Sequence, residues 1–390
     1  MWMLWFRKTG CKDIGIPLKR ESFFRSPQTL IIATFSMKNH PIVTPLFNWY
    51  ARNSRKLPWR ETRNPYYIWL SEVILQQTRV DQGLAYYYKF VETFPTISEL
   101  ANAPLDEVLH CWQGLGYYSR ARNLHIAAKQ VVDRHGGVFP ETYAEIEALK
   151  GIGPYTAAAI SSIAFNLPHA VVDGNVYRFF ARQFGIATPI DSTEGKRVFQ
   201  ELADSLIDQQ NPALFNQAVM EFGATVCKPA NPVCGDCVVS ASCEALKAGT
   251  IQQLPVKQGK TAVRKRWFNY LVLIDSMNQT LIRLRSAKDI WEGLYEFPLI
   301  ETPEELSEDE WLSLPEVSVL LKDKNSTLIR VSPPVKHILS HQILNTRFIH
   351  VRVKNLPQET FPASIRVSTD QLPQFPFPRL ITRFLEDFKC

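Results

Sequence analysis

Apolar residues recur three and four positions apart along residues 41–245, which is the spacing of a helix that buries one face. Residues 65–94 keep this spacing throughout, and residues 144–165 predict a helix, a tight turn and a second helix. Residues 198–207 and 212–227 predict two further amphipathic helices. No segment alternates apolar and polar residues convincingly, as a half-buried strand does. The first part of the chain is therefore predicted to be all-helical.

The spacing of the apolar residues changes to two after residue 266, which is typical of strands. The predicted strands are 267–275, 279–285, 326–331 and 346–356. Residues 304–321 and 370–388 predict helices, so residues 267–390 form an α+β domain in this interpretation. Residues 246–266 have no apolar period and end in a basic run, which predicts an exposed linker.

The composition fits a protein of two or three folded domains. The chain has 390 residues and a net charge of +6, which permits a polyanionic partner without demanding one. No run of 18 apolar residues occurs, so no transmembrane helix is predicted. We expect a monomer in the cytoplasm, associated with the nucleoid in a bacterium.

The first 40 residues have a basic excess and no long apolar core before a small-residue cleavage site, so a secretory signal fits them poorly. An organelle transit peptide and a true start at Met37 both remain open. We expect this extension to be poorly ordered.

Four of the seven cysteines lie together in "CKPANPVCGDCVVSASC", residues 227–243, with six, two and five residues between them. The chain is neither short nor dense in cysteine, so a disulfide scaffold is not indicated. Four clustered thiolates in a reducing compartment favour a metal centre. Iron–sulfur clusters use such ligands, and zinc sites with four cysteines do as well. Zinc sites commonly have two C-x2-C pairs and this stretch has one, but the spacing alone leaves both open.

Two further motifs carry candidate chemistry. In "LKGIGPYTA", Gly151 and Gly153 can adopt positive φ and expose successive N–H groups, and Pro154 suits the first turn of the next helix. Such a turn either binds a phosphate or simply joins two helices. In "AVVDGNVYRF", Asp173 is either a helix N-cap or a catalytic carboxylate.

The order of "LKGIGPYTA", "VVDGNV" and C-x6-C-x2-C-x5-C resembles the helix–hairpin–helix DNA glycosylases of the endonuclease III superfamily. Within it, the chain is similar to the adenine glycosylases from about residue 41 to the C-terminus. This likeness rests on "LPWRETRNPYYIWLSEVILQQTRV", "GLGYYSRARNL", "GIGPYTAAAI" and "WEGLYEFP". It implies a base excision repair enzyme that removes adenine opposite 8-oxoguanine or G in double-stranded DNA. It also implies one 4Fe–4S cluster, and its ligands would be Cys227, Cys234, Cys237 and Cys243.

Such an enzyme needs an acid to protonate adenine and an anion beside the sugar cation. Glu72 lies in a mostly apolar helical stretch, which should raise its pKa, and the resemblance assigns it the role of the acid. Asp173 is the implied anion, and Asn175 helps to place it. Tyr155 stands where strand-cutting relatives have a lysine. Because a phenol forms no Schiff base, we expect base removal without β-elimination.

The resemblance implies further DNA contacts. Gln77 and Tyr117 would fill the gap left by the flipped base. Arg60, Leu75 and Gln217 would line the adenine pocket. The C-terminal part resembles a Nudix fold but lacks the catalytic Glu-rich core, so it is expected to recognise 8-oxoguanine without catalysis. Ser340 and His341 would contact that base, and Leu339 stands where the family has an aromatic residue.

Two other hypotheses remain at this stage. The chain could be an oxidised-pyrimidine or T·G mismatch glycosylase of the same fold, which Glu72 and the C-terminal part speak against. It could also be a non-catalytic DNA-binding protein, although binding alone requires neither Glu72 nor Asp173.

Overall fold

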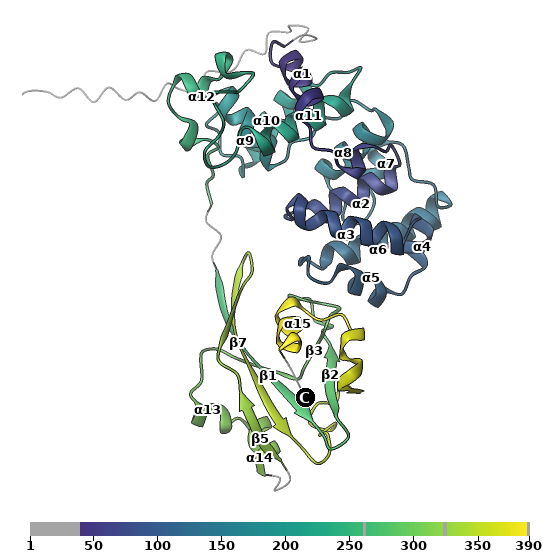
Figure 1. The fold of residues 1–390 in the computed structure, drawn as a ribbon, viewed down its shortest axis with the longest axis vertical. Helices are drawn as coiled ribbons and strands as arrows, with labels where there is room; N and C mark the ends of the chain where they lie inside the picture. Colours follow the sequence, from purple (N-terminus) through teal and green to yellow (C-terminus); the bar gives the residue numbers. More distant parts are fainter. Residues whose placement is uncertain (1–39, 260–262, 323–325, 388–390) are drawn as a thin grey trace, which may run out of the picture. The chain divides into compact units, whose positions relative to one another are not determined.

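The computed structural model describes residues 40–259, 263–322 and 326–387 (Figure 1). The predicted N-terminal extension lies outside this range except for its last residue. The described residues comprise a helical part, residues 40–259, and a β part, residues 263–387. In these described ranges, no helix is long and apolar enough to cross a membrane.

The helical part confirms the all-helical prediction and has two hydrophobic cores. Helices from α2 to α8 surround the first core, while α1 and helices from α9 to α12 surround the second. Helix α11 packs against both α8 and α9, which brings the two cores together. The helices are α1 (Val43–Asn53), α2 (Pro65–Leu75), α3 (Val80–Thr93), α4 (Ile97–Asn102), α5 (Leu105–Trp112), α6 (Ser119–His135), α7 (Tyr143–Glu147), α8 (Pro154–Phe165), α9 (Gly174–Gln183), α10 (Thr193–Leu206), α11 (Pro212–Thr225) and α12 (Glu244–Lys247).

The stretch 65–94, which shows one continuous helical spacing, forms two helices. Helix α2 begins at Pro65 with Asn64 as its N-cap, since the Asn64 side chain accepts a hydrogen bond from Tyr66 N at 3.0 Å. The break at residues 76–79 contains Gln77 in a left-handed conformation, with φ of 56°. A right-handed helix cannot continue through this conformation. Because "QQTR" contains neither glycine nor proline, the sequence gives no sign of the break.

The expected linker at residues 246–266 is largely folded. Leu254 is buried in the second core of the helical part, and Ile251 and Val256 pack against it. Ile190 N donates a hydrogen bond to Val256 O at 3.0 Å, and the Asp191 carboxylate accepts bonds from the backbone of residues 258 and 259. The basic residues from Arg264 onward already belong to strand β1. The few apolar residues here are too irregularly spaced to show a period, yet they pack into the second core of the helical part.

The β part confirms the predicted α+β domain and holds two sheets (Figure 1). One has the order β4-β1-β7-β5 with β6 also paired to β7, and the other has the order β3-β2-β8. The strands are β1 (Arg264–Ile274), β2 (Gln279–Leu284), β3 (Tyr295–Glu296), β4 (Leu299–Thr302), β5 (Thr327–Val331), β6 (Val335–Ile338), β7 (Gln342–Arg352) and β8 (Ser364–Ser368). Strands β1 and β7 are parallel, with Arg264 opposite Gln342.

Strand β1 is buried on both faces, which explains its nearly continuous apolar run. Phe268 and Tyr270 enter a core shared with α15 (Arg379–Glu386), which confirms the helix predicted near the C-terminus. Leu271 and Leu273 enter a second core with Trp311. The short helices α13 (Glu308–Leu312) and α14 (Pro315–Lys322) cover that second core.

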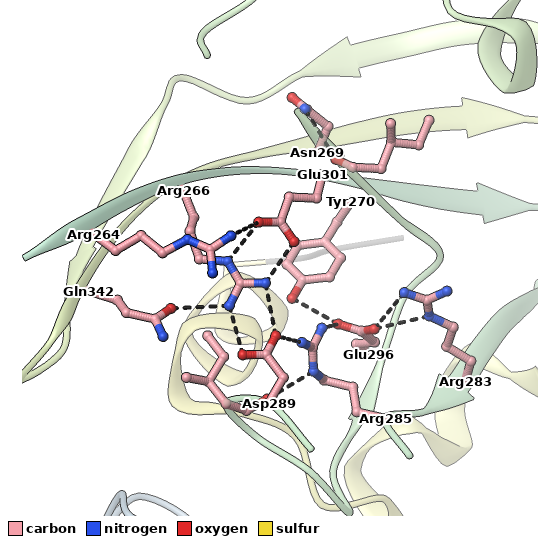
Figure 2. Close-up of polar contacts among 12 residues, drawn as sticks. Arg264, Arg266, Asn269, Tyr270, Arg283, Arg285, Asp289, Glu296, Glu301 and Gln342 are labelled. Atoms are coloured by element: carbon pink, nitrogen blue, oxygen red, sulfur yellow. Dashed lines mark hydrogen bonds and ion pairs between the residues drawn. The ribbon is translucent and has the colours of Figure 1, made fainter. Parts of the chain in front are cut away.

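A network of four arginines and three carboxylates joins the strands of the β part (Figure 2). Arg266 contacts Asp289 at 2.8 Å and Glu301 at 2.6 Å, and its side chain is only 6% exposed. Arg285 bridges Asp289 and the buried Glu296, which Arg283 also contacts. Each of the three carboxylates contacts two arginines, so the buried charges of Arg266, Arg285 and Glu296 are compensated. Arg266 also donates to Gln342 Oε1 at 3.1 Å, which links the network to the start of β7.

Candidate active site

A cavity of about 830 Å³ opens between the two cores of the helical part. Five helices contribute to its walls, namely α2, the start of α3, α8, α9 and α11, together with the short 3-10 helix Pro58–Arg60. Eight of the residues singled out from the sequence line it. They are Arg60, Glu72, Leu75, Gln77, Tyr155, Asp173, Asn175 and Gln217. Residues more than 150 positions apart in the sequence thus share one site.

Glu72 faces this cavity from α2, with Tyr155 from α8 beside it. The Tyr155 hydroxyl donates a hydrogen bond to Glu72 Oε2 at 2.9 Å. The pKa of Glu72 is raised to about 7, because burial and the neighbouring Asp173 raise it more than the Tyr155 bond and Arg60 lower it. Glu72 can therefore hold a proton near neutral pH, as a general acid requires.

Asp173 is the N-cap of α9, which confirms that hypothesis, and it also lines the cavity, where the proposed catalytic carboxylate would have to lie. Its Oδ1 accepts hydrogen bonds from Asn175 N at 2.9 Å and Val176 N at 2.8 Å, and its Oδ2 accepts from Asn175 Nδ2 at 2.7 Å. Burial raises the pKa of Asp173, and these three donors oppose the shift because they stabilise the anion. Arg178 connects Asn175 to the cysteine loop, since it donates to Asn175 Oδ1 at 2.9 Å and to Cys227 O at 2.7 Å.

A buried carboxylate that the sequence analysis missed organises the opposite wall. The Glu221 side chain is fully buried and accepts hydrogen bonds from Arg55 and Arg60 at 2.7 Å each. Burial alone would raise the pKa of Glu221, yet the two arginines outweigh it and lower the pKa to about 2. Arg60 also lies 5.6 Å from the centre of the Tyr50 ring. The Tyr50 hydroxyl donates to Gln217 Oε1 at 2.7 Å, so Arg60 and Gln217 belong to one rigid network.

The two residues expected to fill the gap of a flipped base lie in exposed turns. Gln77 follows α2 and has φ of 56°, while Tyr117 precedes α6 and has φ of 47°. The Tyr117 side chain is 44% exposed. A left-handed conformation is uncommon for residues other than glycine and is often found at functional sites.

The hairpin glycines differ from each other. Gly151 has φ of 78°, and an added Cβ would lie 2.5 Å from Asn123 Cβ, so only glycine fits without strain. Gly153 is the N-cap of α8 with φ of −104°, so the expectation of positive φ is wrong for this residue. Nothing lies within 4 Å of a Cβ added at Gly153, so packing within the protein does not require glycine at this position.

Ser340 and His341 lie at the tip of the hairpin that joins β6 to β7, and both are exposed. Leu339 N donates to Gln342 O at 2.8 Å, which closes the turn. The Leu339 side chain packs partly against the core of the β part. Leu339 therefore helps to hold the turn. The Ser340 hydroxyl shares a hydrogen bond with the Tyr117 hydroxyl, and the His341 side chain is exposed.

The four clustered cysteines line one pocket beside the second core of the helical part. Its remaining walls are mainly apolar, and Arg182 Nη1 lies 3.6 Å from Cys227 Sγ. All four thiols are free. Within the described ranges, no three histidine, cysteine or acidic side chains are placed to hold a metal ion. The four thiols line an apolar pocket with a cation beside one of them, and thiols are the ligand type that negatively charged iron–sulfur clusters use.

Comparisons with known proteins agree with this geometry. Residues 70–204 match the model of the HhH-GPD superfamily base excision DNA repair protein, and residues 269–387 match the NUDIX domain. A thermostable thymine-DNA glycosylase of known structure has a TM-score of 0.50 and 29% identity, and the match covers 53% of this chain and 95% of that one.

Two curated relatives define the family of this chain more narrowly than the family models do. An adenine DNA glycosylase of Buchnera aphidicola subsp. Baizongia pistaciae is 35% identical over 77% of this chain and 82% of its own length. A second, from Buchnera aphidicola subsp. Acyrthosiphon pisum, is 31% identical over 88% of this chain and 96% of its own length. The chain therefore belongs to the adenine DNA glycosylase (MutY) family, whose members are base excision repair enzymes that hydrolyse N-glycosidic bonds.

Proposed function

We propose that this chain, acting as a monomer, excises adenine paired with 8-oxoguanine or G in duplex DNA and leaves the strand intact. The observation that carries the proposal is the pair Glu72 and Asp173, which line one cavity with Tyr155 hydrogen-bonded to Glu72. The two carboxyls have different surroundings. Three donors hold Asp173, whereas Glu72 receives one hydrogen bond. This difference favours a proton on Glu72 and a charge on Asp173.

The proposed reaction follows from the protonated state of Glu72 and the ionised state of Asp173. Glu72 donates its proton to a ring nitrogen of adenine as the glycosidic bond breaks, so the base departs neutral. Asp173 stabilises the positive charge that develops on the sugar, or bonds to the sugar carbon, until a water molecule adds to that carbon and releases a proton. Tyr155 orients the Glu72 carboxyl through its hydroxyl.

The absence of strand cutting has its own support. No lysine occurs among the described residues that line the cavity, and Tyr155 stands at the hairpin position. Without an amine in reach of the sugar carbon, no Schiff base forms and β-elimination does not follow.

The remaining candidate residues fit the binding of duplex DNA. The hairpin at Gly151 and the start of α8 present N–H groups to a phosphate. Gln77 and Tyr117 enter the gap left by the flipped adenine, which Arg60, Leu75 and Gln217 then surround. Ser340 and His341 contact 8-oxoguanine through hydrogen bonds, because hydroxyl and imidazole groups both donate and accept.

The four cysteines hold a 4Fe–4S cluster in this proposal. When bound, the cluster fixes the loop 227–243, and the carbonyl of Cys227 supports Arg178 and, through it, Asn175 and Asp173. No step of the reaction passes through the cluster.

Replacing Cys237 by serine should remove most of the bound iron, because an alcohol is a poor ligand for such a cluster. Metal analysis and the visible absorption of the purified protein measure this loss. The matched control is Cys111→Ser, since Cys111 is buried in α5 outside the pocket. Zinc instead of iron in the wild-type protein, or iron that is unaffected by Cys237→Ser, would contradict the assignment.

The substrate is tested with duplexes that contain A·8-oxoguanine, A·G, A·T, T·G or an oxidised pyrimidine. Each reaction is divided and half is heated in alkali. We expect cleavage of the A·8-oxoguanine and A·G strands at adenine, and only after alkali. Cleavage of the T·G or pyrimidine duplexes would favour the alternative glycosylase. No cleavage by the iron-containing protein would favour a binding protein.

A further inference from the structure

Arg120, in the first turn of α6, has a guanidinium group enclosed by backbone carbonyls. Its acceptors are Val73, Ile74 and Gln76 at 2.8, 3.0 and 2.5 Å from Nη1, and Leu115 and Gly116 at 3.4 and 3.3 Å from Nη2. In the part of the chain that the structure describes, no carboxylate is among its hydrogen-bond or ion-pair partners. A cation without a carboxylate partner is costly to bury, so a role beyond charge compensation is indicated.

The first group of carbonyls belongs to the end of α2. A helix leaves its last carbonyls without internal partners, and its C-terminus has a partial negative charge. Helix α2 ends at Leu75 without a glycine that could close it, and its cap residue Gln76 makes no backbone cap bond. Arg120 provides the missing donors and the favourable charge. The carbonyl of Gln76 that it binds is next in the chain to Gln77.

The second group of carbonyls, those of Leu115 and Gly116, belongs to the turn that precedes α6. The guanidinium carbon of Arg120 lies 4.9 Å from the centre of the Trp112 ring and 5.7 Å from that of the Tyr117 ring. A planar guanidinium packs well on aromatic faces, which lysine cannot imitate. Trp112 Nε1 donates to Gly116 O at 3.0 Å, so the same turn is also held from its other side.

We propose that Arg120 is a positioning residue for base extrusion, because it holds the turn of Gln77 and the turn of Tyr117 at a fixed spacing. The proposal rests on the proposed function, because base flipping is needed only if the chain excises adenine from duplex DNA. Both turns contain a residue with positive φ other than glycine, and one side chain binds backbone atoms of both. Helix α2 also carries Glu72, so Arg120 fixes the two turns relative to the acid.

The charge that this role needs persists in the folded protein. Burial lowers the pKa of Arg120 to about 10, because the guanidinium has lost water without gaining an anion. The group nevertheless stays protonated at neutral pH. Its Nε is buried without a hydrogen-bond partner, which is a further cost of the arrangement.

The test compares Arg120→Met and Arg120→Lys with wild type on a duplex with 2-aminopurine at the adenine position, whose fluorescence rises when the base leaves the stack. We expect Arg120→Met to bind the duplex but to lose most of the fluorescence rise. Single-turnover excision of adenine should fall about 10- to 100-fold, because displacement of the two turns by about 1 Å misplaces the base. Arg120→Lys should lie between the two, since it restores the charge without the planar fork.

Arg134→Met is the matched control, because Arg134 is exposed on the same helix, and it should behave as wild type. If Arg120→Met fails to fold, as thermal unfolding would show, Arg120→Lys decides the question. A wild-type fluorescence rise and excision rate in Arg120→Lys or Arg120→Met would overturn the proposal. Absence of excision by the wild-type protein would instead overturn the proposed function, so the two failures are distinguishable.

Discussion

Glu72→Gln should lower the single-turnover rate of adenine excision by about 10²- to 10⁴-fold, which is the usual contribution of a general acid. Glutamine keeps the size of the side chain and can accept the hydrogen bond of the Tyr155 hydroxyl, so the cavity should keep its shape. It has no proton to give to adenine. The rate is measured with protein in excess over an A·8-oxoguanine duplex, and binding is measured separately with the same duplex.

The control for this change is Glu92→Gln, since Glu92 is exposed on α3 and does not line the cavity. It should excise adenine as wild type does. If Glu72→Gln retained a rate within about twofold of wild type, another group would have to protonate the base, and the assignment of Glu72 would be wrong.

Asp173→Asn should reduce excision by about 10²- to 10³-fold, the usual effect of removing one electrostatic contact to the transition state. The variant separates the two roles of this residue. Asparagine is as good an N-cap as aspartate, so α9 should remain intact and the thermal unfolding temperature should change little. The negative charge beside the sugar is lost, and the new amide group faces the Asn175 amide that donates to Oδ2 in the wild type.

Asp133→Asn, an exposed change on α6, is the control and should leave excision unchanged. If Asp173→Asn lost activity only together with a large loss of thermal stability, the residue would be structural. Nearly wild-type turnover with a normal unfolding temperature would exclude Asp173 from the chemistry.

Local signals in the sequence predicted most of the elements and part of the site. Periodicity identified the helical part, the β part and the helix–turn–helix around Gly151. The apolar neighbours of Glu72 predicted the raised pKa, because burial by adjacent helix residues is visible in a linear pattern. Both hypotheses for Asp173 were also visible in the sequence, although it could not show that the N-cap of α9 lines the cavity.

The features that the sequence did not reveal depend on contacts between distant segments. Glu221 is a single acid in an apolar helix, and only the fold brings Arg55 and Arg60 to it from more than 160 residues away. The break after α2 has no glycine or proline, since Arg120 from another helix closes that end. Residues 251–256 look like part of a linker until the second core gives their few apolar side chains a surface.

The pH dependence of excision tests the central claim most directly, namely that burial keeps a proton on Glu72. Single-turnover rates are measured below saturation, so that they report the free enzyme. Because Glu72 acts in its protonated form and its pKa is about 7, the rate should fall about tenfold per pH unit above pH 7. This fall should be absent from the residual activity of Glu72→Gln. A wild-type rate that is constant from pH 6 to pH 9, or that rises across pH 7, would contradict the account.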